Sequence, residues 1–330
     1  MPITSIFSLS VPRNLTSTLQ HLQTLVGREE HRMWCGGAIP VAKATAFLTK
    51  MAGRYPLLRS TRERSYDRKR GRAAVHMIVC APMDMIGTGQ SAAAGLVSTS
   101  SVGVHRRTSV DMNGDATLCT TLDPTVSSLQ WWLVSGPGTG GLMDPSTPDA
   151  HVARDAMSAA SHIELGDYVL LYATKKEPRS ISDPRSGRSR TVCKEVSTWT
   201  WRIRSEVRSA VRAEIDDACR RLEYGAEPGN GKGGWGLRGL LATQRRRPLF
   251  AGVRNDVIEI HRYARDAWDA RRPMWLRSHP DLAARYAGSA GALRPIGDVM
   301  KDHLPTMPRV RLYDDPPLRV ADLLQRFERS

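Results

Sequence analysis

Residues 167–222 constrain the fold most, because their pattern changes from strand to basic loop, back to strand and then to helix. Residues 167–174 and 191–203 are apolar runs rich in β-branched and aromatic side chains, which predicts two paired strands. Between them, Ser182-Asp-Pro-Arg-Ser-Gly187 has turn chemistry, since proline presets its φ and glycine accepts a positive one. We therefore expect a β-hairpin that projects a cationic loop. The cations of this loop are Lys175, Lys176, Arg179, Arg185, Arg188 and Arg190.

The charge of the whole chain also indicates a polyanionic partner. The 330 residues carry a formal net charge of +15, and only 8 of the 48 basic residues are Lys, which leaves 40 Arg. Guanidinium groups form bidentate hydrogen bonds with phosphate and stack on bases, so the bias favours nucleic acid. A GC-rich genome explains the Arg bias alone equally well. We expect a nucleic-acid partner, RNA slightly favoured over DNA, together with other subunits of a nucleoprotein complex and without a membrane.

The cysteines favour a reducing compartment. Their number, five, is odd, and their spacing fits neither a disulfide framework nor a zinc site. The N-terminal residues lack the pattern of a signal peptide, and no apolar run reaches the ~18 residues of a membrane span. We expect a cytoplasmic protein without a metal or cofactor.

Four regions follow from composition and periodicity. The N-terminal region should contain a strand ending near Val11, a helix ending at Gly27, a second helix opening at Pro40 and a buried strand over 73–81. Within its Ser/Gly/Thr-rich insertion, Asn113-Gly114 predicts a hairpin turn. The predicted regions are 1–128 with the insertion at 84–128, 129–224 with the basic hairpin, a glycine-rich linker at 225–236, and a helical basic region at 237–330.

The second region sets the expected fold class. A strand at 129–135, a helix at 149–161, the hairpin and the following helix give the order β, α, β, β, α. This order predicts an α+β protein with a mixed or antiparallel sheet and a ferredoxin-like segment, followed by a helical C-terminal part. In element order alone, residues 129–222 resemble ferredoxin-like RNA-binding subunits, including CRISPR-associated RAMP proteins. The resemblance implies RNA binding and carries no diagnostic motif.

Two predicted helices separate apolar, basic and acidic residues. In 207–222, an apolar stripe at helical spacing is flanked by Arg208 and Arg212. In 253–272, a second stripe has Arg254, His261, Arg265 and Arg272 on one flank and Asp256, Glu259 and Asp266 on the other, and Pro273 is expected to end the helix. We interpret the two Arg flanks as walls of one nucleic-acid groove. Solvated helix surfaces with local ion pairs explain the same pattern.

The second hairpin strand places Trp199 and Trp201 on one side. Two aromatic residues at this spacing stack bases in RNA-recognition sheets, whereas most tryptophans on strands belong to the core. Both interpretations stay open at this point. The full predicted nucleic-acid site is Lys175, Lys176, Arg179, Arg185, Arg188, Arg190, Trp199, Trp201, Arg202, Arg204, Arg208, Arg212, Arg245, Arg246, Arg247, Arg254, Arg265 and Arg272.

Signals for catalysis are weaker. The glycine-rich residues 136–141 satisfy G-x-G-x-x-G, but Pro145 and Pro148 oppose the helix that a dinucleotide site requires. A metal-independent RNase needs little beyond a positioned histidine and cations, for which His261 and His105 are the candidates. The sequence predicts a nucleic-acid-binding subunit of a ribonucleoprotein or mobile-element complex. The alternatives are a RAMP-like RNA-processing endoribonuclease and a plasmid or phage protein of DNA replication or maintenance.

Overall fold

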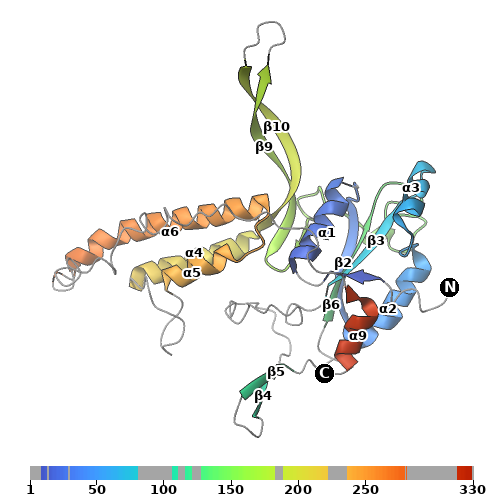
Figure 1. The fold of residues 1–330 in the computed structure, drawn as a ribbon, viewed down its shortest axis with the longest axis horizontal. Coiled ribbons are helices and arrows are strands. Elements are labelled where there is room, and N and C mark those ends of the chain that lie inside the picture. The colour runs from blue at the N-terminus through green and yellow to red at the C-terminus, as the bar shows by residue number, and fades with distance from the viewer. Residues whose placement is uncertain are drawn as a thin grey trace. The chain divides into compact units, whose positions relative to one another are not determined.

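The computed structural model describes residues 9–12, 15–28, 30–80, 106–110, 116–120, 128–182, 189–221, 236–278, 280 and 318–328 (Figure 1). The chain divides into two compact units. Unit 1 consists of residues 1–163, 174–199 and 311–330, and unit 2 of residues 164–173 and 200–310. The fold is mixed α+β, with antiparallel sheets and helices.

A four-stranded antiparallel sheet forms the centre of unit 1, in the order β3-β6-β2-β7. These strands are β2 (Met33–Pro40), β3 (Val75–Cys80), β6 (Ser128–Ser135) and β7 (Arg154–Asp155). The predicted strands at 73–81 and 129–135 are confirmed as β3 and β6. The sequence did not reveal β2, because its two central residues are glycines and it ends at a proline.

Helices cover both faces of this sheet. Helix α1 (Leu15–Arg28) lies on the face of Cys80, whose sulfur accepts a hydrogen bond from the Thr18 hydroxyl at 3.7 Å. Helix α2 (Val41–Arg54) lies on the other face, where Phe47 contacts Trp131. Both helices confirm the predictions. The buried stripe of α2, Val41, Ala44, Leu48 and Met51, is the one that the sequence spacing indicated.

Helix α3 (Thr61–Lys69) occupies the basic run that follows α2. Its first turn is a capping box: the Ser60 hydroxyl accepts the Glu63 amide, and the Glu63 carboxylate accepts the Ser60 amide at 2.7 Å. This reciprocal cap explains why a segment dense in like charges is helical. The sequence analysis did not predict this helix.

The glycine-rich residues 136–141 form a tight turn against residues 71–73. Gly138 has φ +126°, and a Cβ there would lie 2.7 Å from the Ala73 nitrogen, so only glycine fits. The Thr139 carbonyl accepts the Ala73 amide at 3.0 Å. No dinucleotide-binding helix begins in this turn. Instead, its backbone packs directly against the backbone of residues 71–73.

The predicted helix over 149–161 is wrong. The structure has a short 3₁₀ helix, η2 (Ala150–Val152), followed by β7 and by turns. Asp149 does not cap a helix with its side chain, because the carboxylate accepts hydrogen bonds from Arg54 and Tyr55. Moreover, β6 and the long hairpin belong to different sheets. The ferredoxin-like arrangement of residues 129–222 is therefore not confirmed.

The basic hairpin is present and longer than predicted. Strands β9 (Tyr168–Ser182) and β10 (Ser189–Ile203) pair, and β8 (Ile163–Leu165) adds a third strand beside β9 (Figure 1). Residues 175–182 and 189–190, expected in the loop, continue the strands. Of the predicted turn, 182–187, Ser182 ends β9 and residues 183–187 lie outside the described part of the chain.

Unit 2 contains three helices: α4 (Ser205–Arg221), α5 (Leu237–Arg245) and α6 (Ala251–Ser278). All three were predicted, and α4 packs along α6 (Figure 1). The apolar stripes also match, since Val211, Ile215, Val257 and Ala264 are buried. One boundary is wrong, because α6 continues past Pro273. Proline removes the hydrogen bond to the carbonyl of Asp269, whose exposed position lets water take the place of the missing donor.

The remaining elements are short. Strands β4 (Arg106–Val110) and β5 (Ala116–Thr120) pair antiparallel, as the predicted hairpin requires, and the turn residues Asn113 and Gly114 lie outside the described part of the chain. Strand β1 (Ser10–Val11) pairs with β11 (Leu318–Arg319), which leads into α9 (Val320–Glu328). Residues 225–235 of the predicted linker and most of the predicted 84–128 insertion lie outside the described residues.

Candidate nucleic-acid interface

The cations of the hairpin occupy strand positions rather than a free loop. Lys175, Lys176 and Arg179 lie in β9 and Arg190 in β10, whereas positions 185 and 188 lie outside the described residues. Near these cations, the Thr174 and Ser197 hydroxyls form a cross-strand hydrogen bond at 2.8 Å. The backbone of these four cationic residues therefore belongs to a two-stranded ribbon.

The two tryptophans of β10 belong to the core. Trp199 is 7% exposed and Trp201 is 0% exposed, so neither ring offers a face to a base. The Trp201 backbone also contacts α6, where a Cβ at Gly252 would lie 2.3 Å from the Trp201 oxygen. Trp199 and Trp201 are therefore core residues that do not stack on bases, and the proposed interface does not include them.

Two predicted phosphate ligands, Arg202 and Arg208, are already paired with a carboxylate. Asp256, which has no exposed surface, accepts hydrogen bonds from Arg202 Nε at 2.9 and 3.1 Å and from the Ile203 amide at 2.8 Å. Arg202 Nη2 bonds to the same carboxylate, and Arg208 Nη1 lies 3.4 Å from it. Both guanidiniums also approach Glu259 at 3.9–4.0 Å. They join β10 and α4 to α6 and are not surplus charge.

Arg204 and Arg247 have similar structural roles at the base of the hairpin. Arg247 donates to the Asp167 carboxylate at 2.8 Å, and its guanidinium lies over the Tyr168 ring. Arg204 lies 3.5 Å from the Glu164 carboxylate, and its amide donates to the Asp167 carbonyl. These contacts hold the strand ends in unit 2.

The remaining predicted arginines of unit 2 lie nearer to solvent. Arg254 and Arg265 are exposed on α6, and Arg246 is exposed just after α5. Arg212 is also exposed, with its guanidinium over the Tyr263 ring. Arg245 is half-buried, and for Arg272 the structure describes the helical backbone alone. Arg265 lies 3.6 Å from the exposed Asp266 carboxylate, a contact that solvent screens strongly.

The histidine candidates gain no support as catalysts. His261 is 2% exposed, and burial, together with the nearby charge of Arg245, lowers its pKa to about 4. A base with this burial has no path to a substrate in this conformation. His105 lies outside the described residues. Within the described residues, no three His, Cys, Asp or Glu side chains are grouped for metal binding.

The sequence analysis missed a basic surface on α3. Arg62, Tyr66 and Lys69 are spaced by four and three residues, which places them on one helix face beside Arg70. The Arg70 guanidinium lies 4.2 Å from the Tyr66 ring centre, and Tyr66 is 53% exposed. We name this set, with the exposed Arg68, the α3 basic surface. Its signal in the sequence was the capping box followed by cations at helical spacing.

Both acids of α3 are engaged elsewhere. Asp67 is 5% exposed and pairs with Arg59, with Arg72 3.8 Å away. Hydrogen bonds from the Ser60 amide and hydroxyl hold the pKa of Glu63 below its usual value, so this carboxylate stays ionised in its cap. Neither acid forms an ion pair with Arg62 or Lys69 among the contacts that the structure describes. The α3 basic surface is therefore a local excess of exposed positive charge.

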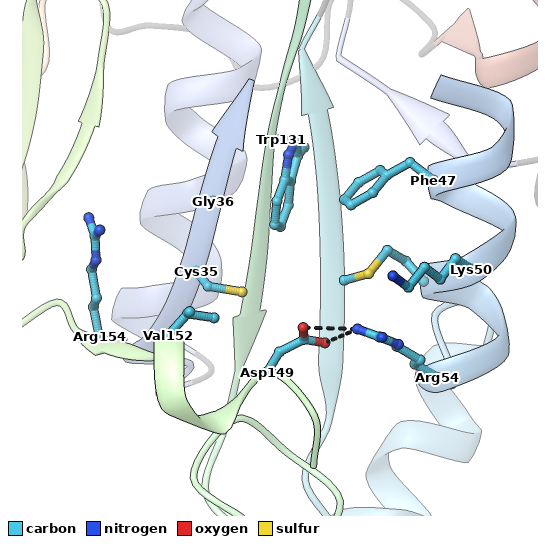
Figure 2. A pocket seen from close by; sticks show the side chains of 10 residues that line it. Cys35, Gly36, Phe47, Lys50, Arg54, Trp131, Asp149, Val152 and Arg154 are labelled. Carbon is cyan, nitrogen blue, oxygen red and sulfur yellow. Dashed lines mark hydrogen bonds and ion pairs between the residues drawn. The ribbon is translucent and has the colours of Figure 1, made fainter. Parts of the chain in front are cut away.

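A separate pocket of about 370 Å³ lies between α2 and the central sheet (Figure 2). Trp131 of β6 and Phe47 of α2 line it, with ring centres 4.8 Å apart. Figure 2 shows Lys50 and the Arg54–Asp149 ion pair beside these rings. The Cys35 thiol also lines the pocket, and its burial raises its pKa to about 12. This thiol is protonated at neutral pH, which makes it a poor nucleophile.

Comparison with models of protein families, with curated proteins and with solved structures found no match, so function is inferred from the residues themselves. Among the residues that the structure describes, no helix has the length and apolar character needed to cross a bilayer.

Proposed function

We propose that this protein binds nucleic acid through its phosphate backbone, with RNA slightly favoured, as a subunit of a ribonucleoprotein or mobile-element complex. The observation that carries the proposal is the α3 basic surface. Its cations are exposed while the two acids of the same helix are committed to a cap and to a buried ion pair. Clustered exposed cations next to an exposed aromatic ring suit a phosphate backbone with bases beside it.

The charge of α6 adds a second basic element. Arg254 and Arg265 are 11 residues apart, which corresponds to three turns and about 16.5 Å along the helix, so they lie on one face. Arg208 of the predicted groove and Arg202 of the predicted site gain no support, because both pair with Asp256 and approach Glu259. The proposed nucleic-acid contacts are therefore the α3 basic surface and the hairpin cations in unit 1 and, separately, the exposed arginines of α6 in unit 2.

A binding assay with the full chain tests the proposal. Fluorescence anisotropy is measured at low salt with labelled RNA and DNA of one sequence, each as a single strand and as a duplex. Wild type should bind, and the triple variant Arg62→Ala, Lys69→Ala, Arg70→Ala should bind more weakly. The control is Arg32→Ala, Lys43→Ala, Arg220→Ala, which removes three exposed cations elsewhere. A wild-type protein that binds none of these probes would refute the proposal.

The same assay separates the alternative functions. A preference for duplex DNA over single strands would favour a protein of DNA replication or maintenance. Cleavage of the RNA probe without added metal would favour an endoribonuclease, an activity for which the burial of His261 provides no support. Cytoplasmic localisation remains part of the proposal, and the free thiols Cys35, Cys80, Cys193 and Cys219 are consistent with it.

A further inference from the structure

The pocket between α2 and the central sheet combines an aromatic wall with a positive end. The half-buried rings of Trp131 and Phe47 are in contact, with centres 4.8 Å apart and planes tilted by 50°, so together they form one wall of the pocket. The pocket volume of about 370 Å³ lies within the roughly 300–1,000 Å³ of small-molecule sites. An aromatic wall of this kind suits a planar ring more than an aliphatic chain.

The glycines of β2 keep the indole accessible. Gly37 lies opposite Trp131 in the strand register, and a Cβ at Gly37 would lie 3.8 Å from the indole nitrogen. A larger side chain at this position would therefore lie against the ring. Gly36 is required for another reason, since its Cβ would lie 2.6 Å from the Trp131 carbonyl oxygen. The two glycines allow the strands to pair closely and leave the ring uncovered.

The charges at the pocket favour an anion. Asp149 accepts hydrogen bonds from Arg54 at 3.0 and 3.1 Å and from the Tyr55 hydroxyl at 2.9 Å, so its charge is already neutralised. Lys50 is exposed on α2, one helical turn before Arg54, and forms no ion pair with a carboxylate among the described residues. Arg154 of β7 also lines the pocket and is exposed, so the lining carries two positive charges, Lys50 and Arg154, beyond the Arg54–Asp149 pair (Figure 2).

We propose that this pocket binds one nucleotide of a single strand, with its base against Trp131 and Phe47 and its phosphate at Lys50. The inference rests on the proposed function and extends it, because it assigns a site that accepts an unpaired base. A base within a duplex is stacked between its neighbours and cannot lie against these rings. The pocket should therefore distinguish single strands from duplexes, whereas exposed cations bind the backbone of both.

Three variants test this assignment in the full chain. Trp131→Leu removes the stacking surface, Gly37→Val places a branched side chain against the intact indole, and Trp131→Phe keeps an aromatic ring. Leu58→Ala, an exposed apolar residue outside the pocket, serves as the control. Circular dichroism and thermal unfolding confirm that each variant is folded.

Loss of base stacking should weaken single-strand binding by about fivefold or more in Trp131→Leu and Gly37→Val. Duplex binding should change by less than twofold, and Trp131→Phe should retain most of the wild-type affinity. If both pocket variants bind single strands as tightly as wild type does, or lose duplex binding equally, the assignment is wrong. In that case the proposed function still stands.

Titration calorimetry with AMP and UMP tests the pocket without a strand. Wild type should bind a nucleotide more tightly than the corresponding nucleoside, and Lys50→Ala should reduce that difference, with Arg154 left as the remaining cation of the lining beyond the Arg54–Asp149 pair. A wild-type protein that binds strands but gives no heat with either nucleotide, and is unaffected by Gly37→Val, would overturn the assignment. A protein that binds nucleotides but no strand would refute the proposed function and keep the pocket as a nucleotide site.

Discussion

Replacing Asp256 by Ala should be one of the most destabilising single changes in unit 2. The Asp256 carboxylate has no exposed surface and bonds to Arg202, Arg208 and the Ile203 amide. Removing it leaves a buried N–H without its acceptor and two guanidiniums without a counter-charge. Breaking a buried pair in this way costs about 3–5 kcal/mol. Because the arginine side chains are 31% and 30% exposed, water compensates in part, and we expect about 3 kcal/mol.

The neighbouring acid Glu259 provides a matched control. It lies 3.9–4.0 Å from the same two arginines, but its side chain is 48% exposed. Glu259→Ala should therefore cost no more than about 0.5 kcal/mol. Asp256→Asn should fall between the two, because the amide oxygen still accepts the Ile203 N–H while the charge is lost.

Urea unfolding followed by tryptophan fluorescence measures these differences, since Trp201 and Trp268 are fully buried in unit 2. With a slope of about 1–3 kcal/mol per molar urea, Asp256→Ala should lower the transition midpoint by about 1 M or more. Equal effects of Asp256→Ala and Glu259→Ala, or a change below about 1 kcal/mol for Asp256→Ala, would contradict this account of the ion-pair network.

Two further predictions concern stability. Burial lowers the pKa of His76 to about 2 and that of His261 to about 4, so both stay neutral in the folded protein while the unfolded chain binds their protons below about pH 6.5. The free energy of unfolding should therefore fall between pH 7 and pH 5 by about 2 kcal/mol for each histidine. His261→Gln should reduce this fall, as measured by urea unfolding at the two pH values. An identical pH dependence in wild type and variant would show that His261 does not cause it. Gly252→Ala should destabilise by about 1–3 kcal/mol, because the new Cβ meets the Trp201 carbonyl, whereas Gly53→Ala meets nothing within 4 Å and should stabilise α2. Thermal unfolding of the two variants compares them directly, and a shift in the same direction for both would refute the steric argument.

The sequence predicted helices correctly where apolar residues recur at helical spacing. The apolar stripes of α2, α4 and α6 are buried as expected, because this spacing places the apolar residues on one face of each helix. Strand β2 gave no such signal, since the exposed Gly36 and Gly37 carry no side chain. The segment 149–161 contains apolar residues at helical spacing, but the Asp149 side chain bonds to Arg54 on α2 instead of capping a helix.

Long-range ion pairs explain most of the difference between the predicted and the observed interface. A helical wheel placed Asp256 on an acidic flank of α6 but did not reveal that this flank faces β10, 54 residues earlier in the chain. The same limitation made Arg202 and Arg208 look like surplus charge. In α3, by contrast, the cap and the spacing of Arg62, Tyr66 and Lys69 are local features. The sequence analysis missed this surface, although these features could have been recognised in the sequence.

The salt dependence of binding tests the central claim most directly. The affinity of the full chain for a labelled single-stranded RNA is measured between 50 and 200 mM salt, roughly the range over which counterion release dominates. If Arg62, Lys69 and Arg70 each contact a phosphate, the Arg62→Ala, Lys69→Ala, Arg70→Ala variant should reduce the slope of log K against log salt by about 2. The control Arg32→Ala, Lys43→Ala, Arg220→Ala should leave the slope close to that of wild type. An equal slope for wild type and the α3 variant would contradict the claim that this surface binds phosphate.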